Sequence, residues 1–280
     1  MSLTKESVVV VTGAGSGIGR ALALRLSDQT IAGIALADID AAALDETNSL
    51  IDGKGPVVSA HRVDVSDESA IIRFVGEVVA KHGRVTHVIN NAGVALKGQV
   101  ADLSIEEIRW LIDINFWGVV YGTKYFLPYL QKEASAHVVN VSSIFSYVAL
   151  PGHAAYAASK FAIRGFTESL RQELKGTNVA VSVVIPGGVN TNIVNRTRMA
   201  SALDLGEADI DEWKERSNTA LRTTSPYTAA EIIVEGIRAR RPVIMIGSDA
   251  RILRLIVRLF PKSYFAVLDL LSMGAVRDKV

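Results

Sequence analysis

The chain has 280 residues, a net charge of +1, 49% hydrophobic and 21% charged residues, and no cysteine. The absence of cysteine excludes disulfides and thiolate metal sites, and the five histidines lack the spacing of a zinc ligand set, so we predict no metal site. The balanced charge gives no reason to expect nucleic acid as a partner. The first residues lack signal-peptide architecture, so we expect a cytoplasmic protein.

Short runs rich in valine, isoleucine and alanine alternate with longer amphipathic runs. We predict strands at 7–11, 30–37, 57–63, 85–90, 136–142, 179–185 and 243–247, and helices at 17–27, 40–51, 67–82, 104–132, 155–175 and 226–239. Strands that alternate with helices indicate βαβ units, and strands as apolar as VVVV and VSVVI are typical of sheets buried on both faces. The predicted fold class is therefore α/β, with a doubly wound, Rossmann-type parallel sheet of about seven strands in a single domain.

Two regions depart from this alternation. Residues 190–225 form a long, charged and irregular insertion, and residues 248–280 continue well beyond the last predicted strand. Long loops in compact domains are often functional. We therefore divide the chain into a dinucleotide-binding and catalytic domain, 1–248, with a substrate lid at 190–225, and an amphipathic C-terminal extension, 249–280.

A glycine cluster, TGAGSGIG, lies directly between the first strand and the first helix. Because position 18 is isoleucine, the pattern is T-G-x-x-x-G-x-G, with Gly13, Gly17 and Gly19, and not G-x-G-x-x-G. Glycines let the backbone approach a pyrophosphate, and the helix N-terminus supplies N–H groups and a positive dipole end. We interpret the cluster as a dinucleotide site, with a plain tight turn as the alternative.

An aspartate, Asp38, ends the second strand nineteen residues after Gly19. A carboxylate at this offset can accept hydrogen bonds from the adenosine ribose and repels a 2′-phosphate. Neither position 16 nor position 39 holds a Lys or Arg that would bind such a phosphate. We therefore predict NAD in preference to NADP, with a helix N-cap by Asp38 or Asp40 as the alternative interpretation.

The segment HAAYAASK places Tyr156 and Lys160 four residues apart, on one face of a predicted helix. A free tyrosine has a pKa near 10, and a neighbouring ammonium lowers it toward a useful value for a general base. An ordinary surface helix is the alternative for such a pair considered alone.

Together these patterns resemble the short-chain dehydrogenase/reductase family, in its simple single-domain form with a Y-x-x-x-K active site. The resemblance also includes Asp64-Val65, NNAG at 90–93, Asn115, the serines of NVSSIF, and PGGVNT at 186–191. It implies cofactor contacts at Gly13, Ser16, Gly17, Ile18, Gly19, Asp38, Asp64, Val65, Asn91, Ala92, Gly93, Tyr156, Lys160, Pro186, Gly187, Val189 and Thr191.

The same resemblance implies four catalytic residues. Tyr156 is the general acid/base, and Ser143, thirteen residues before it and preferred to Ser142, donates to the substrate oxygen. Lys160 also binds the nicotinamide ribose, and Asn115 holds a water that connects Lys160 to solvent. The cofactor carries the hydride.

The substrate cavity is expected to be lined by residues 94–96, residues 144–148 and the lid. Val94, Phe145, Tyr147 and His153 are the predicted substrate contacts, and most of the lining is apolar. We predict an NAD-dependent oxidoreductase acting on a hydrophobic secondary alcohol or ketone, such as a steroid, a retinoid or an aryl/alkyl carbinol. The alternatives are a 3-oxoacyl thioester reductase using NADPH and a non-catalytic nucleotide-sensing scaffold.

Two surfaces indicate partners. The predicted helix 104–132 is apolar over more than one face, which together with the resemblance implies a homodimer or homotetramer. The extension 249–280 has six Lys/Arg and three Asp, with Arg251, Arg254 and Arg258 on one helical face. We expect it to pack on the domain or on a partner subunit, with peripheral membrane contact as the alternative. We also expect truncation after Ser248 to leave NAD binding nearly unchanged.

Overall fold

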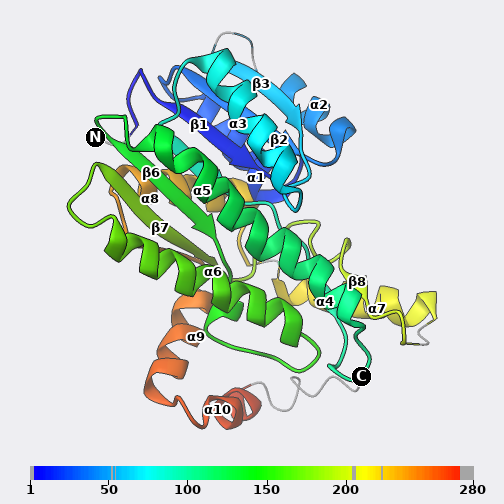
Figure 1. The fold of residues 1–280 in the computed structure, drawn as a ribbon. Coiled ribbons are helices and arrows are strands. Elements are labelled where there is room, and N and C mark those ends of the chain that lie inside the picture. Colours follow the sequence, from blue (N-terminus) through cyan, green and yellow to red (C-terminus); the bar gives the residue numbers. More distant parts are fainter. Residues whose placement is uncertain (1–2, 52, 54, 204–205, 222, 272–280) are drawn as a thin grey trace.

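The computed structural model describes residues 3–51, 53, 55–203, 206–221 and 223–271, and Figure 1 shows their arrangement. Seven parallel strands form the sheet in the order β3–β2–β1–β4–β6–β7–β9. They are β1 (Val8–Thr12), β2 (Gly33–Asp38), β3 (Val57–Arg62), β4 (His87–Asn90), β6 (Ala136–Val141), β7 (Val179–Pro186) and β9 (Val243–Ile246). The predicted strands and fold class are confirmed, with strand ends shifted by a few residues.

Helices cover both faces of the sheet (Figure 1). One face packs against α1 (Gly17–Ser27), α2 (Ala41–Ser49) and α8 (Pro226–Arg238), and the other packs against α3 (Glu68–His82), α5 (Gly118–Leu130) and α6 (Ala154–Glu173). Alternate side chains of a strand point to opposite faces. In β1, Val9 and Val11 accordingly join one apolar cluster and Val10 joins the other, and all three are fully buried.

The order of the strands reverses between β1 and β4. In an open α/β sheet, helices leave such neighbouring strands in opposite directions and open a crevice at their carboxyl ends, where ligands bind. The glycine cluster follows β1, and NNAG begins with the last residue of β4. Both motifs therefore border this crevice.

The predicted helix 104–132 is interrupted. It consists of α4 (Ile105–Ile112), a π-helical turn (Asp113–Trp117) and α5, and Asn115 lies in the π turn with no exposed surface. Single π-helical turns inside α-helices are frequent at functional sites. The amphipathic pattern alone did not indicate the interruption.

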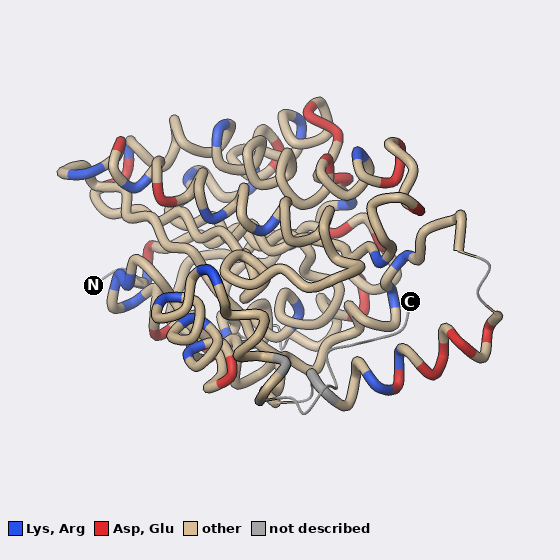
Figure 2. Tube along the Cα trace, turned by 90° about the horizontal axis from the view of Figure 1, so that it is seen from below, with Lys and Arg blue, Asp and Glu red and all other residues tan. Residues whose placement is uncertain are grey.

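The insertion 190–225 is more regular than predicted. Its strand β8 (Arg198–Met199) pairs in parallel with β5 (Leu96–Lys97), and its helix α7 is Glu207–Leu221. Figure 2 shows α7 extending from the body of the molecule with acidic and basic residues along it. The sequence did not indicate β8, because a strand of two residues has no detectable periodicity. It did not indicate α7, because the many charged residues of this helix obscure its weak amphipathic pattern.

The described part of the extension, up to residue 271, contains α9 (Ser248–Leu259) and α10 (Tyr264–Leu271), and residues 272–280 lie outside the described residues. Helix α9 packs beside β9 and beside the short helical turn η2 (Ile144–Ser146) that follows β6. Among the described residues, no helix combines the length and the apolar character needed to cross a membrane.

Candidate active site

The glycine cluster forms a left-handed turn that leads into α1. Gly13 has φ +66° and Gly17 has φ +54°, backbone angles that residues other than glycine rarely adopt. A Cβ at Gly19 would lie 1.9 Å from the carbonyl oxygen of Gly13. Ser16 occupies the N-cap position of α1, and Ile18 lies in its first turn. The turn therefore requires glycine at these three positions and leaves the helix N-terminus open to an anion.

Thr12 joins this turn to the NNAG motif. Its hydroxyl oxygen accepts hydrogen bonds from the backbone N–H groups of Asn91 (3.0 Å) and Ala92 (3.1 Å). The side-chain amide of Asn91 donates to the carbonyl oxygen of Thr12 at 2.9 Å. These bonds fix the ends of β1 and β4 relative to each other and place Gly93 beside the predicted catalytic residues.

The two aspartates at the end of β2, Asp38 in its last position and Asp40 two residues later, have different roles. Asp40 caps α2 by accepting from the N–H of Ala43 at 3.1 Å, so the N-cap alternative applies to Asp40. Asp38 accepts instead from the backbone N–H groups of Gly15 (2.8 Å) and Asp40 (3.0 Å). Its carboxylate therefore lies against the glycine turn, where a bound ribose would meet it.

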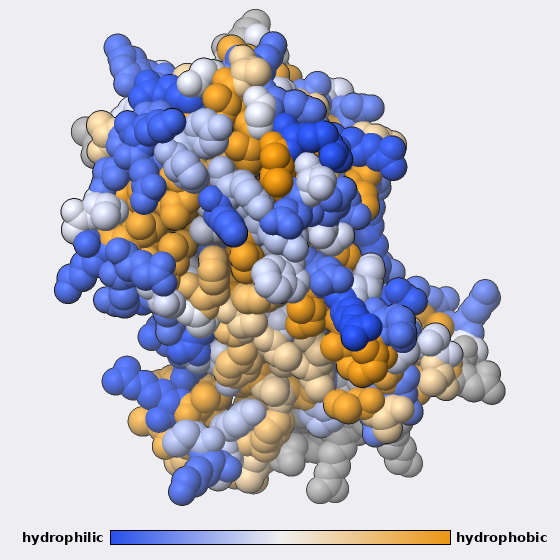
Figure 3. Space-filling model, viewed as in Figure 1, coloured by the Kyte–Doolittle hydropathy of each residue, from blue (hydrophilic) through white to orange (hydrophobic). Residues whose placement is uncertain are grey.

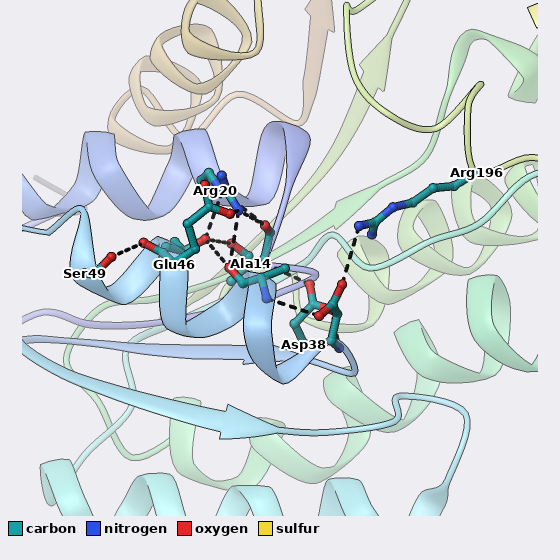
Figure 4. A network of polar contacts seen from close by, with 10 residues as sticks. Ala14, Arg20, Asp38, Glu46, Ser49 and Arg196 are labelled. Atoms are coloured by element: carbon teal, nitrogen blue, oxygen red, sulfur yellow. Dashed lines mark hydrogen bonds and ion pairs between the residues drawn. The ribbon is translucent and has the colours of Figure 1, made fainter.

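Sequence reasoning missed Arg20, which stabilises the glycine turn from α1 (Figure 4). Its guanidinium donates to the carbonyl oxygen of Gly15 (2.7 Å) and to the hydroxyl of Thr47 (3.0 Å), and it pairs with Glu46 at 2.6 Å. An Arg on a predicted helix gives no local signal of such a role, because all three partners come from other segments.

A cavity of about 340 Å³ opens beside this network. It is lined by Gly15, Ser16, Gly17, Arg20, Ala43, Glu46, Asn192 and Arg196. Arg196 comes from the segment after β7, points across toward the end of β2, and lies 3.5 Å from Asp40 (Figure 4). The glycine turn and the helix N-terminus beside this cavity fit the phosphates of a dinucleotide, and the Asp38 carboxylate, bonded to the same turn, fits its ribose.

Asp64 and Val65 follow β3 after one intervening residue. Asp64 accepts from the N–H of Ser66 at 2.9 Å and from its hydroxyl at 2.6 Å. Val65 is buried and packs against Gly118, at which a Cβ would lie 2.9 Å from its side chain. Both residues therefore lie at the carboxyl edge of the sheet, next to the first turn of α5.

The π turn brings Asn115 to the end of NNAG. Its side chain accepts from the N–H of Val94 at 2.8 Å and donates to the carbonyl oxygen of Val94 at 3.0 Å and to the hydroxyl of Ser159 at 3.1 Å. A Cβ at Gly93 would lie 3.2 Å from Asn115 Oδ1 and 3.4 Å from Lys160 Nζ. The missing side chain at Gly93 therefore leaves a space bordered by two of the predicted catalytic residues.

Tyr156, Lys160 and Ser143 come together at the start of α6. Lys160 Nζ lies 5.5 Å from the centre of the Tyr156 ring, and the hydroxyl of Ser143 is hydrogen-bonded to Tyr156. The hydroxyl of Ser142 instead donates to the carbonyl oxygen of Lys160 at 2.8 Å. The structure thus directs Ser143 at the tyrosine, whereas Ser142 anchors the helix.

Burial dominates the electrostatics of this pair. It raises the pKa of Tyr156 to about 12, although the hydrogen bond with Ser143 opposes the rise, and it lowers the pKa of Lys160 to about 8. The pKa of Tyr156 is therefore shifted upward, whereas from the sequence we expected the neighbouring Lys160 to shift it downward. The reason is that loss of water around the phenolate outweighs the hydrogen bond with Ser143.

The loop after β7 is held by the C-terminal extension, a contact that sequence reasoning missed. The carboxylate of Asp249, in α9, accepts from the N–H of Gly188 at 2.6 Å and occupies the space that a side chain at Gly187 would need. Pro186 ends β7, Val189 is buried, and Thr191 lies against Gly17. Truncation after Ser248 removes this carboxylate, so we no longer expect it to leave cofactor binding unchanged.

The predicted substrate contacts separate into two groups. Val94 and Phe145 belong to an apolar cluster around Tyr156, and the Phe145 ring lies 5.4 Å from the Tyr156 ring and 5.2 Å from that of His153. Tyr147 instead lies within cation–π distance of Arg164 (3.9 Å) and Arg254 (5.6 Å). Tyr147 therefore connects α6 to α9.

The lid covers this cluster and is attached to α4. Ala200 and Leu203 pack with Tyr156 and Leu96 in the cluster. Glu107, buried in α4, accepts from the N–H of Ser201 at 2.9 Å. The lid therefore contributes to the apolar surroundings of the tyrosine, and Glu107 is a further residue that sequence reasoning did not single out.

Comparison with known proteins gives consistent similarities. A family profile described as short chain dehydrogenase matches residues 7–202. A protein of Mycobacterium tuberculosis named "Putative oxidoreductase SadH" is 41% identical over 266 residues, which cover 94% of each chain. The dehydrogenase/reductase SDR family member 7B of Bos taurus is 30% identical over 94% of this chain and 81% of its own. The structure of a short-chain dehydrogenase/reductase from Burkholderia phymatum in complex with NAD gives a TM-score of 0.79, with 26% identity and 98% of both chains covered.

Proposed function

The chain belongs to the short-chain dehydrogenase/reductase family of oxidoreductases, and on this basis we propose that it transfers a hydride between NAD and a hydrophobic secondary alcohol or ketone. A steroid, a retinoid or an aryl/alkyl carbinol is the expected type of substrate. The observation that carries the proposal is the buried group of Tyr156, Lys160 and Ser143 beside Gly93.

The chain supplies the proton chemistry, and a bound nicotinamide supplies or accepts the hydride. With its pKa raised to about 12, Tyr156 remains a phenol at neutral pH and can donate its proton to a substrate carbonyl oxygen. The hydroxyl of Ser143 can donate a second hydrogen bond to the same oxygen as negative charge develops there. Alcohol oxidation needs the phenolate, which the ammonium of Lys160 stabilises electrostatically.

The charges around the cavity support NAD over NADP. Arg20 is engaged by Glu46 and by the carbonyl oxygen of Gly15, and Arg196 faces Asp40. The carboxylate of Asp38 forms no ion pair within the described part of the chain, and Arg62, its register partner on β3, donates to the carbonyl oxygen of Ile39. A 2′-phosphate would therefore meet the negative charge of Asp38.

The surroundings of Tyr156 support a hydrophobic substrate. The cluster around it contains Leu96, Phe145, Ala200 and Leu203, from three separate segments of the chain. Apolar walls with a few polar groups at the reacting atom are typical of small-molecule sites. A polar substrate would lose its hydration against these walls without gaining hydrogen bonds.

We also propose that the enzyme is a homodimer or homotetramer assembled through α5 and α6. Trp117, just before α5, is 41% exposed, and Phe161 in α6 is 44% exposed. Figure 3 shows apolar residues along the middle of this face, with hydrophilic residues toward its edges. Apolar centres with polar rims are typical of subunit interfaces.

The test is turnover with NAD(H) and NADP(H) across a panel of secondary alcohols, ketones and 3-oxoacyl thioesters. We expect Tyr156→Phe to lower turnover by at least about 100-fold, the contribution of a general acid/base. Cofactor affinity and the melting temperature should hardly change. Tyr227→Phe, at an exposed tyrosine of α8, is the matched control. Turnover by Tyr156→Phe within a few-fold of wild type would refute the assignment.

A further inference from the structure

Helix α9 uses one face to attach to the catalytic domain. Ala250 is fully buried, and Leu253 and Val257 pack against a cluster that includes Ile144 and Val148. The hydroxyl of Tyr264, at the start of α10, lies 3.5 Å from the backbone nitrogen of Ala149. This part of the arrangement agrees with the expectation that the extension packs on the domain, next to the segment that follows Ser143.

The opposite face of α9 is apolar as well, and it is exposed. Ile252, Leu255 and Leu259 lie at i, i+3 and i+7, so they share one side of the helix. Their exposed fractions are 57%, 55% and 61%, and Phe260 and Phe265 are also exposed. A chain that stabilises α9 through one apolar face gains nothing for folding by placing a second one in water.

Cations border this exposed face. Arg251, Arg258 and Lys262 are exposed, and none of them has an ion-pair partner within the described part of the chain. The nearby carboxylate of Asp249 is turned inward onto the N–H of Gly188. The surface around the apolar stripe is therefore positively charged. Figure 3 shows apolar residues beside hydrophilic ones on α9, at the lower end of the molecule.

We propose that α9 and α10 bind peripherally to an anionic lipid membrane. The stripe of Ile252, Leu255 and Leu259 enters the boundary between headgroups and acyl chains, and Arg251, Arg258 and Lys262 bind anionic headgroups. Arginine and lysine suit this position because their aliphatic stems accompany the apolar residues while the charge remains among the headgroups.

Charge favours a membrane over a second copy of the chain as the occupant of this surface. In a symmetric pair, the same patch contributes from both subunits. Both copies would then bring Arg251 and Arg258 to one contact, and the carboxylate of Asp249 is already engaged with Gly188. An anionic bilayer satisfies both the apolar stripe and the cations.

The contact also gives the extension a role in catalysis, and this step rests on the proposed function. Helix α9 packs on Ile144, Phe145 and Tyr147, which directly follow Ser143, and Phe145 contacts Tyr156. Binding through the outer face of α9 therefore holds the segment 144–148, which contacts Tyr156 through Phe145, close to the membrane. A hydrophobic alcohol or ketone that partitions into the bilayer would reach Tyr156 without first crossing water.

The experiment is co-sedimentation of the full-length protein with vesicles of phosphatidylcholine alone and of phosphatidylcholine mixed with phosphatidylglycerol. We expect the protein to bind only to the mixed vesicles. Binding should weaken at high salt, because salt screens the electrostatic attraction between the cations and the anionic headgroups. Ile252→Ser combined with Leu255→Ser and Leu259→Ser should weaken binding at least about tenfold. Arg251→Gln combined with Arg258→Gln should weaken it about 25-fold, or about fivefold for each charge.

The controls separate binding from folding, assembly and activity. Ile72→Ser with Arg73→Gln changes an exposed apolar residue and an exposed cation on α3 and should bind vesicles like wild type. All variants should keep the wild-type melting temperature and the wild-type turnover of a water-soluble alcohol. If no alcohol is turned over but vesicles are bound, the proposed function fails and the membrane surface stands.

Three results would overturn the membrane proposal. The first is no sedimentation with the mixed vesicles, and the second is equal sedimentation of wild type and the triple serine variant. The third is a smaller oligomer of the triple variant in analytical ultracentrifugation, which would make this face a contact between copies of the chain.

Discussion

Glu107 uses one carboxylate oxygen to attach the lid to α4 and the other to cap the N-terminus of α4. One oxygen accepts from the N–H of Ser201 at 2.9 Å and lies 3.9 Å from the guanidinium of Arg198, and the other accepts from the N–H of Ser104 at 2.9 Å. The hydrogen bond from Ser104 is the main reason that the pKa of this buried carboxyl is lowered. Glu107 therefore remains charged at neutral pH.

Replacing this residue by glutamine keeps the shape of the side chain but removes one acceptor. The amide oxygen can serve either Ser104 or Ser201, and the –NH₂ group then faces the other backbone N–H. A buried donor without an acceptor costs about 1–3 kcal/mol. If the cost falls on the contact with Ser201, the equilibrium between closed and open lid shifts by about 5- to 150-fold.

We therefore expect Glu107→Gln to lower kcat/KM for bulky hydrophobic substrates by about 5- to 150-fold, mainly through a higher KM. Cofactor affinity should change little, because Glu107 contacts the lid and not the glycine turn. The matched control is Glu106→Gln, which changes the exposed neighbour in the same helix turn. Steady-state kinetics and cofactor titration provide the measurements. An unchanged KM, or equal effects in the two variants, would refute the role of Glu107 in holding the lid.

Three further outcomes follow from the structure. We expect the wild-type enzyme to prefer NAD over NADP by at least about tenfold in kcat/KM. The double variant Asp38→Ala with Ile39→Arg should reduce or reverse this preference. Equal wild-type kcat/KM values for the two cofactors would refute the role of Asp38 in cofactor choice. Asp249→Asn should weaken cofactor binding several-fold, since its carboxylate holds the N–H of Gly188, and an unchanged dissociation constant would contradict this. Burial lowers the pKa of His137 to about 3, whereas the pKa of histidine in the unfolded chain is near 6.5. As the pH falls below 6.5, His137 is therefore protonated in the unfolded state but not in the folded state. The free energy of unfolding should then fall by about 1.4 kcal/mol for each pH unit in that window, and urea titrations that give equal stability at pH 7 and pH 5 would exclude it.

The sequence determined the features that depend on local or periodic patterns. The apolar runs of β1 and β7 predicted a sheet buried on both faces, because a strand covered by helices on both faces needs apolar side chains at successive positions. The glycine spacing predicted the turn after β1, since left-handed backbone angles at Gly13 and Gly17 exclude most other residues. Tyr156 and Lys160 share a helical face for the same local reason.

Only the tertiary structure decided which distant groups support these motifs. Asp249 reaches a loop residue 61 positions away, and Glu107 reaches one 94 positions away. Such contacts leave no periodic signal in the chain, because each depends on where whole elements pack. The raised pKa of Tyr156 has the same origin, since it follows from burial of the side chain in the packed structure. The two apolar faces of α9 also look alike in the sequence, and only packing on β9 and η2 decides which of them remains exposed.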